Sequence, residues 1–340
     1  MYTEFYKLRA EPFLLTPDHR FYFDSTVHSQ AMAHLLYGIN RGEGFIVITG
    51  DVGAGKTTLV KQLCATLDSR NIIAAHVVTT LVDGADLLRM VMASFGLNDI
   101  PTDKSSMLLR LQRFFETAHR EGRRALLIVD EAQNLSITAL EELRMLSNFQ
   151  IGNTAPFQAF LVGQPQFRDT FANPALEQLR QRVITSYHLG PMSREEVGEY
   201  LPHRLRRVGW TNDPQFDESA IDAIFHHTSG IPRRINNLSS RLLLLGFLDD
   251  LHRFTGEEVD KVATDMVAES ARPAQATTAP ANGNGEAKGS QELINSLLRE
   301  APDLITRIER IEERLNRHDD NLSRAAAVFR DFLKFAMSER

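Results

Sequence analysis

Residues 50–57 read Gly-Asp-Val-Gly-Ala-Gly-Lys-Thr, which fits the pattern G-x-x-x-x-G-K-[ST]. The segment comes directly after an apolar run, Phe45–Thr49, and directly before a helical stretch that begins near Gly55. Glycines let such a loop bend so that its backbone N–H groups point at phosphate oxygens, while the lysine adds a positive charge. The pattern in this context predicts a site for a nucleoside triphosphate. The residues expected to bind the nucleotide here are Gly50, Asp51, Val52, Gly53, Ala54, Gly55, Lys56, Thr57 and Thr58.

A second chemical feature follows another apolar run, Ala125–Val129, which leads at once into the two carboxylates Asp130 and Glu131. Mg²⁺ takes hydroxyl and carboxylate oxygens together with those of substrate phosphates, so Thr57 and Asp130 are expected to hold it. Glu131 would then polarise the attacking water, and Lys56 would contact the β- and γ-phosphates. Taken without the glycine-rich loop, the carboxylate pair has a plainer explanation, because acidic residues often cap the turn after a buried strand.

The composition sets limits on the class of protein. The chain has 340 residues, 43% hydrophobic and 24% charged, with a formal net charge of -6 and one cysteine, Cys64. These values exclude collagen-like, disulfide-stapled and wholly disordered proteins. The apolar runs are far shorter than the roughly 18 residues of a membrane-spanning helix, and no secretory signal is expected. We therefore expect a cytoplasmic protein, and its acidic balance argues against a large nucleic-acid surface.

The apolar periodicity predicts the elements that position these residues. The predicted strands are Phe45–Thr49, Ile72–Val78, Ala125–Val129 and Phe157–Val162, and the helices between them are Gly55–Leu67, Gly84–Phe95, Ser105–Arg120 and Thr138–Phe149. Strands that alternate with helices indicate an α/β fold with a parallel sheet between helical layers. Four more helices are predicted after Met192, with no strand between them: Ser193–Val208, Asp217–Thr228, Pro232–Leu248 and Gly256–Ala268.

These patterns divide the chain into four parts. Residues 1–190 are expected to form an α/β nucleotide-binding domain, and residues 191–269 an all-α lid. Residues 270–290 are dominated by small and polar residues and are predicted to be a flexible linker. Residues 291–340 carry an apolar heptad stripe and are predicted to form an amphipathic or coiled-coil helix. This stripe fits self-association, binding of a partner protein, or docking on the chain's own domain.

The paired motifs resemble the AAA+ branch of the P-loop NTPases, in which a helical lid follows the sheet domain. Within that branch the first 268 residues are similar to the general secretion pathway protein A (ExeA-type) ATPases. The similarity is strongest to the subfamily associated with PEP-CTERM/exosortase and exopolysaccharide loci. It rests on Tyr2–Phe23, Gly42–Gly50, Asp130–Leu135, Leu161–Pro165, Leu179–Arg182 and Gly230–Asn236.

The resemblance implies roles for three further residues. Gln164, after the fourth predicted strand, takes the place of the polar sensor of the γ-phosphate or the lytic water. Arg182 takes the place of the arginine finger that reaches a neighbouring subunit's nucleotide, with Arg180 as its competitor. Arg233 takes the place of the second sensor, on the lid. Each also has an ordinary structural interpretation: a strand-ending turn for Gln164, a surface helix for Arg182 and lid packing for Arg233.

The function implied by the resemblance is Mg²⁺-dependent ATP binding and hydrolysis by an oligomer. It would drive or switch the assembly of an envelope secretion or exopolysaccharide system, with membrane contact at the inner membrane through a protein partner. One alternative is a TniB-like transposition or DNA-remodelling ATPase. Five arginines favour it if they face phosphates rather than form a solvated helix face: Arg204, Arg206, Arg207, Arg233 and Arg234. Another is a nucleotide-gated scaffold that recruits a partner through the C-terminal heptads. The net charge counts against DNA.

Overall fold

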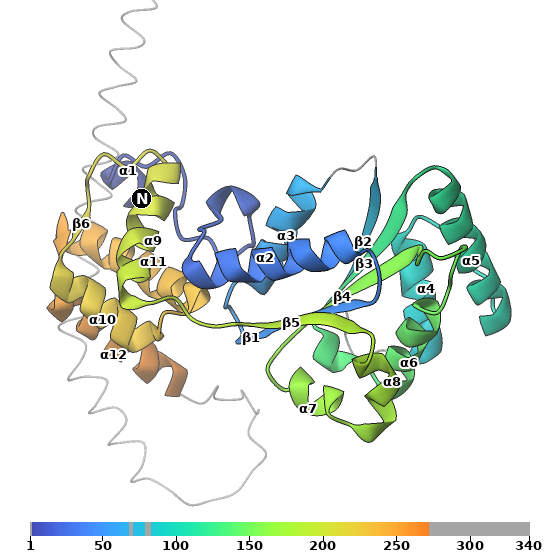
Figure 1. The fold of residues 1–340 in the computed structure, drawn as a ribbon. Coiled ribbons are helices and arrows are strands. Elements are labelled where there is room, and N and C mark those ends of the chain that lie inside the picture. Colours follow the sequence, from blue (N-terminus) through green and yellow to red (C-terminus); the bar gives the residue numbers. More distant parts are fainter. Residues whose placement is uncertain (1, 68–70, 79–82, 272–340) are drawn as a thin grey trace, which may run out of the picture. The chain divides into compact units, whose positions relative to one another are not determined.

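A five-stranded parallel sheet with the strand order β2–β3–β4–β1–β5 organises the chain (Figure 1). The computed structural model describes residues 2–67, 71–78 and 83–271. The strands are β1 Phe45–Gly50, β2 Ile72–Val78, β3 Arg124–Asp130, β4 Phe157–Gly163 and β5 Val183–Leu189. Both β1 and β4 are buried along their whole length, as is typical of parallel strands covered by helices on both faces.

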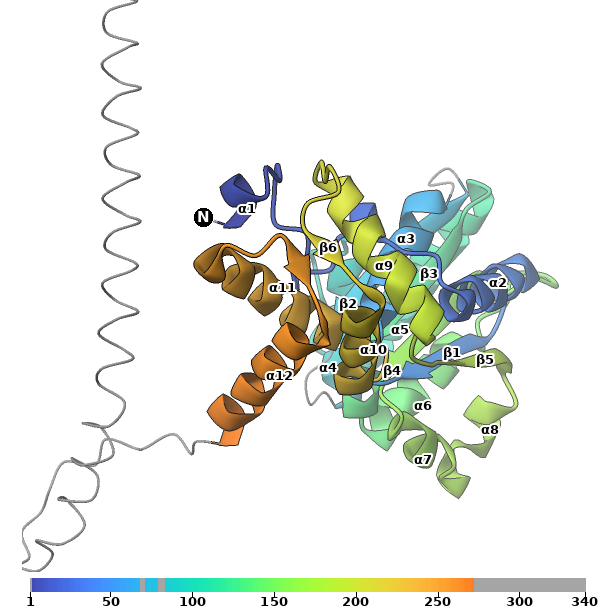
Figure 2. The ribbon, with the colours of Figure 1, turned by 90° about the vertical axis from the view of Figure 1, so that its left-hand side faces the viewer.

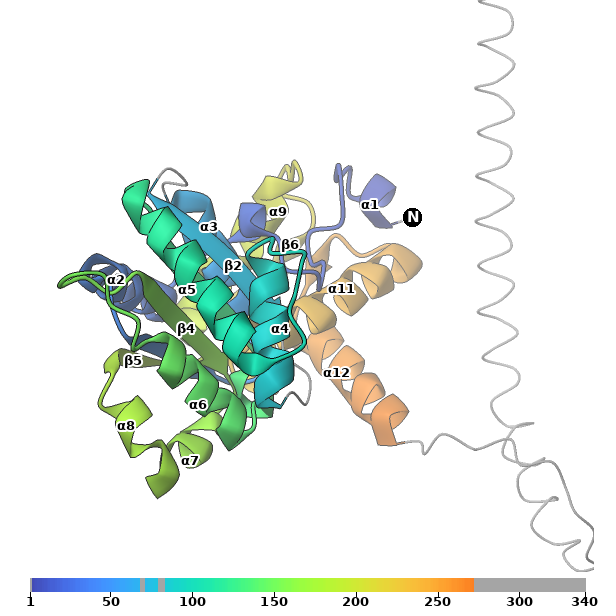
Figure 3. The same ribbon diagram turned by 90° about the vertical axis from the view of Figure 1, so that its right-hand side faces the viewer.

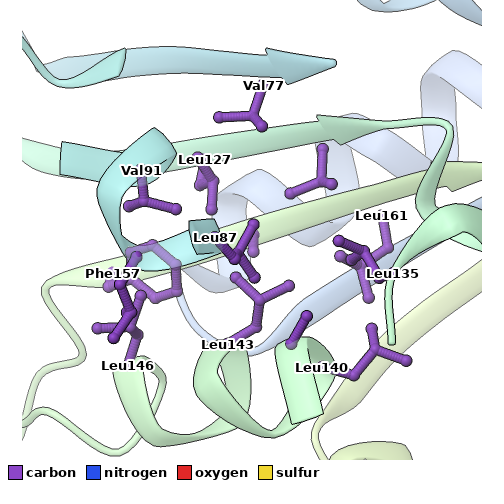
Figure 4. Packing of buried hydrophobic residues seen from close by; sticks show 14 of the residues in the cluster. Val77, Leu87, Val91, Leu127, Leu135, Leu140, Leu143, Leu146, Phe157 and Leu161 are labelled. Carbon is purple, nitrogen blue, oxygen red and sulfur yellow. The ribbon is translucent and has the colours of Figure 1, made fainter. Parts of the chain in front are cut away.

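Helices cover the two faces of the sheet because successive side chains of each strand point to opposite sides. On one side Ile46 and Ile48 of β1 pack in a cluster with α2 Thr26–Arg41 and α3 Lys56–Thr66. On the other side lie α4 Gly84–Ser94, α5 Lys104–Arg120 and α6 Ile137–Leu146, which Figure 3 shows side by side. Figure 4 shows leucines of α4 and α6 packed against β3 and β4 in the larger cluster.

Short elements connect this framework. They are α1 Tyr2–Phe5, η1 His19–Phe21, η2 Ala132–Asn134, α7 Phe167–Phe171, η3 Pro174–Leu176 and α8 Glu177–Arg180. The four predicted strands are confirmed to within one residue at either end, and the α/β class is confirmed with them. The helix α2, the strand β5 and these short elements were not predicted. The linker was predicted to begin at residue 270, but residues 270 and 271 end a helix, α12 Gly256–Ala271. The rest of the predicted linker and the predicted heptad helix lie outside the described residues.

After β5 the chain forms the helices α9 Arg194–Arg207, α10 Glu218–Thr228, α11 Pro232–Asp249 and α12 Gly256–Ala271, which share their own hydrophobic cluster (Figure 2). The expectation that no strand separates these helices is wrong, because β6 Gln215–Phe216 and β7 Arg253–Phe254 pair in parallel. Each short strand directly precedes a helix, and the pairing satisfies backbone groups of both segments. Within the described ranges, none of the helices combines the length and apolar character needed to cross a bilayer.

The N-terminal segment is formed by residues 2–23. Its first part packs with these helices rather than with the sheet. Tyr6, Leu8 and Phe13 belong to the cluster formed by α9–α12, and the hydroxyl of Tyr6 donates to the carbonyl of Leu251 at 2.8 Å. The segment then crosses to the sheet, where η1 lies against both α3 and α9. The N-terminal segment thus contacts both the helices α9–α12 and α3, the helix that follows the glycine-rich loop.

Arg204 of α9 fastens this segment. Its side chain is buried, and its guanidinium donates from Nε to the carbonyl of Pro12 at 2.7 Å and from Nη2 to that of Leu14 at 3.2 Å. The guanidinium also lies over the ring of Phe21, with 4.5 Å between Cζ and the ring centroid. Arg204 is therefore not part of a solvated helix face, and that interpretation of it from the sequence was wrong.

We expect Arg204→Ala to lower the free energy of unfolding by about 2–4 kcal/mol. The substitution removes the donor to the Pro12 carbonyl, leaves the Leu14 carbonyl with Asn236 as its donor, and removes a packed stem. Urea denaturation measures this loss. The matched control is Arg207→Ala, an exposed arginine of the same helix, which should change the free energy by about 0.5 kcal/mol or less. Equal effects of the two substitutions would contradict the fastening role.

Candidate nucleotide-binding site

The predicted chemical residues meet at one edge of the sheet. Because β1, β3 and β4 are parallel neighbours, their carboxyl ends lie together. β1 leads into the glycine-rich loop, β3 ends at Asp130, and β4 ends one residue before Gln164. The structure therefore brings together Lys56, Thr57, Asp130, Glu131 and Gln164 from segments distant in the sequence.

The glycine-rich loop curls around the side chain of Lys56. Its Nζ donates to the carbonyls of Gly50 at 2.7 Å and Asp51 at 2.9 Å, and the side chain is buried. Burial lowers the pKa of the Lys56 ammonium, while the nearby Glu131 and Asp130 raise it. The loop ends at Gly55, whose φ of 99° is a left-handed conformation that glycine adopts without strain.

The hydroxyl of Thr57 donates to Oδ2 of Asp130 at 2.8 Å, which joins the first turn of α3 to the end of β3. Asp130 is 5% exposed, and the imidazole of His76 on β2 lies 3.9 Å from the same oxygen. A hydroxyl and a carboxylate oxygen in contact are the hard donors that Mg²⁺ takes in phosphate sites. The two residues therefore fit the predicted metal site in chemistry and position.

Glu131 lies at the centre of a small polar network. Its backbone is left-handed, with a φ of 57°, a conformation uncommon outside glycine and typical of functional sites. Its Oε2 accepts from Nε2 of Gln133 at 2.6 Å and from Nε2 of Gln164 at 3.1 Å. Gln133 was not predicted as a site residue. Its signals in the sequence are its position two residues after Glu131 and its place in Asp130–Leu135, one of the segments that carry the family resemblance.

Arg233 brings the lid to the loop. It lies in the first turn of α11, and its backbone N–H donates to the carbonyl of Gly53 at 3.2 Å. A Cβ on Gly53 would lie 2.4 Å from that of Arg233, so only glycine allows this approach. The contact puts Arg233 beside the glycine-rich loop, and its sensor role stays a prediction.

A pocket opens between the loop and the lid. It is lined by Lys56, Thr57, Thr58, Glu131 and Arg233 together with residues of the N-terminal segment and of α9 and α11. From the N-terminal segment come Leu14, Leu15, Thr16, Pro17, Asp18, Phe21, Tyr22 and Phe23, and from the helices Tyr200, Arg204 and Asn236. The sequence alone favours packing for the N-terminal aromatic residues and leaves a role near the adenine unassigned, whereas the structure places Phe21, Tyr22 and Phe23 on the wall of this pocket.

His28 and Glu196 connect the lid to the loop through α2. The buried ring of His28 has Nδ1 2.7 Å from the Ser25 hydroxyl, and its Nε2 would lie 2.6 Å from a Cβ on Gly55. Glu196 of α9 accepts from the backbone N–H groups of Thr26 at 2.6 Å and Ser193 at 2.8 Å. One carboxylate thus caps α9 and holds the start of α2, which carries the histidine at the loop.

The structure does not bring Arg180 or Arg182 to this site. Val183 pairs with Phe45 at the start of β1, whereas the loop follows Gly50, which pairs with Leu189. At about 3.3 Å per residue, the start of β5 is about 20 Å from the loop. Arg182 donates to the carbonyl of Ser147 at 2.8 Å, and Arg180 donates to the carbonyls of Phe171 and Asn173.

Comparison with known proteins agrees with this fold. Residues 39–171 match the AAA domain family. Solved structures with a similar fold include the ORC2 protein of Aeropyrum pernix, with a TM-score of 0.55 and 17% identity over 74% of this chain and 72% of that one. The Cdc6p structure of Pyrobaculum aerophilum gives a TM-score of 0.58 and 15% identity over 75% of this chain and 70% of that one. These likenesses establish the fold.

The chain has the AAA+ P-loop fold, and its match to the AAA domain family covers residues 39–171. It is a homologue of general secretion pathway protein A of Aeromonas hydrophila, with 34% identity over 270 residues, which are 78% of this chain and 48% of the relative. The ATP-dependent target DNA activator B of Escherichia phage Mu is 30% identical over 104 residues, 31% of each chain. The chain thus spans less than half the length of either relative.

The burial of His28 predicts a pH dependence of stability. Desolvation lowers the pKa of His28, although Ala54, Glu196 and Asp24 act to raise it. Because the folded-state pKa lies below the value of about 6.5 in an unfolded chain, protonation favours unfolding. The stabilisation is complete above about pH 6.5 and is lost as the pH falls.

We therefore expect His28→Gln to reduce the fall in melting temperature between about pH 7.5 and pH 5.5, measured by differential scanning fluorimetry. His34→Gln, which replaces an exposed histidine of the same helix, should keep the wild-type slope. An unchanged slope in His28→Gln would show that other groups cause the dependence.

Proposed function

We propose that the chain binds ATP with Mg²⁺ and hydrolyses it to ADP and phosphate. The observation that carries this proposal is the convergence of Lys56, Thr57, Asp130 and Glu131 at the carboxyl ends of β1 and β3. Membership of the AAA+ class supports it. Residues 1–190 would act as the nucleotide-binding domain and residues 191–269 as the lid.

Each residue has a distinct task in the proposed reaction. The loop N–H groups and the Lys56 ammonium bind the β- and γ-phosphates, while Thr57 and Asp130 hold the metal. When bound, Mg²⁺ neutralises the charge of the phosphate oxygens. Glu131 orients a water molecule and accepts its proton as the water oxygen attacks the γ-phosphorus and the bond to ADP breaks. Gln164, in contact with Glu131, is suited to sense the γ-phosphate or this water.

The lid side of the pocket is suited to the nucleoside. The aromatic rings of Phe21 and Tyr22 and the apolar side chains of Leu14 and Leu15 line it, and the Tyr200 hydroxyl donates to Asn236 at 2.8 Å on its helical wall. An apolar and aromatic surface with few polar groups favours binding of a planar nucleobase. Arg233 would then contact the γ-phosphate from the same chain.

We further propose that hydrolysis requires an oligomer. Arg182 lies at the amino end of the sheet, whereas the glycine-rich loop of the same chain lies at the carboxyl end. Arg182 can therefore act on a nucleotide only in a neighbouring subunit. A guanidinium there stabilises the charge that spreads over the transferring phosphoryl group. Arg180 remains the competing candidate; its guanidinium donates to the carbonyls of Phe171 and Asn173.

The proposed role is to drive or switch the assembly of an envelope secretion system, or of an exopolysaccharide or exosortase-associated system, from the cytoplasmic side of the inner membrane. Homology to general secretion pathway protein A supports the secretion part. The predicted heptads of residues 291–340 would bind the protein partner. The phage Mu relative favours DNA remodelling as a second candidate, and salt-dependent DNA affinity would distinguish it.

We expect Glu131→Gln to bind ATP within about threefold of the wild-type affinity and to lose at least about 100-fold in kcat, because it keeps the shape but removes the base. A fluorescent ATP analogue measures binding, and phosphate release measures turnover. Glu121→Gln, at an exposed turn, is the control and should leave both values unchanged. Near-normal turnover in Glu131→Gln would remove this residue from its proposed role.

Trans action of Arg182 predicts complementation between subunits. We expect wild-type specific activity to rise with protein concentration and Arg182→Ala to lose at least about 100-fold in kcat. Mixing Arg182→Ala with Lys56→Ala should restore activity, because each supplies the residue that the other lacks. Arg180→Ala tests the competing candidate and should keep the wild-type kcat, whereas loss of kcat in Arg180→Ala but not in Arg182→Ala would assign the finger to Arg180. Activity of Arg182→Ala that persists at every concentration would contradict this mechanism.

A further inference from the structure

Gln133 lies at the junction of the two segments that carry the proposed base and sensor. It belongs to η2, the single turn that follows Glu131, and this turn returns the chain over the end of β4. A Cβ on Gly163, the last residue of β4, would lie 3.2 Å from Oε1 of Gln133, so the carboxamide is packed closely against the strand end. The half-buried side chain is thus placed between β3 and β4.

The hydrogen bonds fix which way the carboxamide faces. Its Oε1 accepts from the backbone N–H of Gln164 at 2.9 Å, and its Nε2 donates to Oε2 of Glu131 at 2.6 Å. A flipped amide would direct NH₂ at an N–H donor and an oxygen at a carboxylate, and both contacts would be repulsive. One side chain therefore ties the backbone of the sensor segment to the carboxylate of the base.

We propose that Gln133 is a positioning residue for hydrolysis, which sets the orientation of the Glu131 carboxylate relative to the sensor segment. This inference rests on the proposed ATPase function. The side chain of Gln164 shares the same oxygen of Glu131, but it must turn to reach a phosphate. Gln133 instead contacts the backbone N–H of Gln164, so this hydrogen bond persists when the side chain of Gln164 turns. It therefore keeps the Glu131 carboxylate at a fixed position relative to Gln164.

Two substitutions of similar length separate positioning of the carboxylate from support of the turn. Gln133→Met keeps the size of the side chain but makes neither hydrogen bond. Gln133→Glu keeps the acceptor for the N–H of Gln164, but it places a second carboxylate against Glu131. The positioning role predicts the order of kcat as wild type, then Gln133→Met, then Gln133→Glu. Support of the turn alone predicts that Gln133→Glu is closer to the wild type.

The experiment measures kcat and KM by phosphate release and Kd with a fluorescent ATP analogue, using the full chain. We expect Kd within about threefold of the wild type for both variants, and kcat lowered about tenfold in Gln133→Met and further in Gln133→Glu. Gln133→Asn, which withdraws the amide by one bond, provides a third variant and should lower kcat at unchanged Kd. The midpoints of urea denaturation of all three variants verify that they fold.

The outcomes distinguish this inference from the function on which it rests. A wild-type chain that binds ATP without hydrolysis overturns both proposals. A wild-type chain that hydrolyses ATP while the variants keep its kcat, or while Gln133→Glu exceeds Gln133→Met, overturns the positioning role alone. Parallel losses of Kd and kcat in all three variants also overturn it, because they indicate a structural role.

Discussion

The hydrogen bond between Thr57 and Asp130 connects the two halves of the site, which are the glycine-rich loop with its helix and the carboxylates at the end of β3. The other site residues are arranged around this bond. It joins the helix that follows β1 to the end of β3, although β4 lies between these strands. Such a bond forms only where parallel strands end at one level, because side chains of this length reach only a few ångströms. The buried apolar strands supply that alignment, so the core sets the geometry of the polar edge.

The lid and the loop are connected by backbone contacts rather than by side chains alone. The N–H of Arg233 donates to Gly53, and Glu196 joins the starts of α9 and α2, whose His28 packs against Gly55. Arg204 holds the N-terminal segment on the same helices. A movement of the lid would therefore be transmitted to the phosphate loop. It would also be transmitted to the wall of the pocket where we propose that the nucleobase of ATP binds.

Local patterns in the sequence predicted the buried strands and the phosphate loop, because those segments carry their own signals. Apolar runs mark β1, β3 and β4, and the spacing of Gly50, Gly55 and Lys56 identifies the loop. The edge strand β5 escaped prediction because it is exposed on one side and mixes Thr185, Ser186 and His188 with apolar residues. The contacts of Gln133 and Arg204 depend on segments that only the folded chain brings together, so no local pattern could predict them.

The two ends of the sheet have different chemistry, and this difference bears on regulation. Groups that bind phosphate and metal lie at the carboxyl end, whereas Arg182 is fixed at the amino end by its bond to Ser147 at the end of α6. A guanidinium so far from its own loop cannot lower the barrier for its own nucleotide, since stabilisation of the transition state requires contact. If Arg182 is the finger, a single chain holds a complete binding site and an incomplete catalytic one. Assembly, rather than nucleotide binding, would then determine when hydrolysis begins.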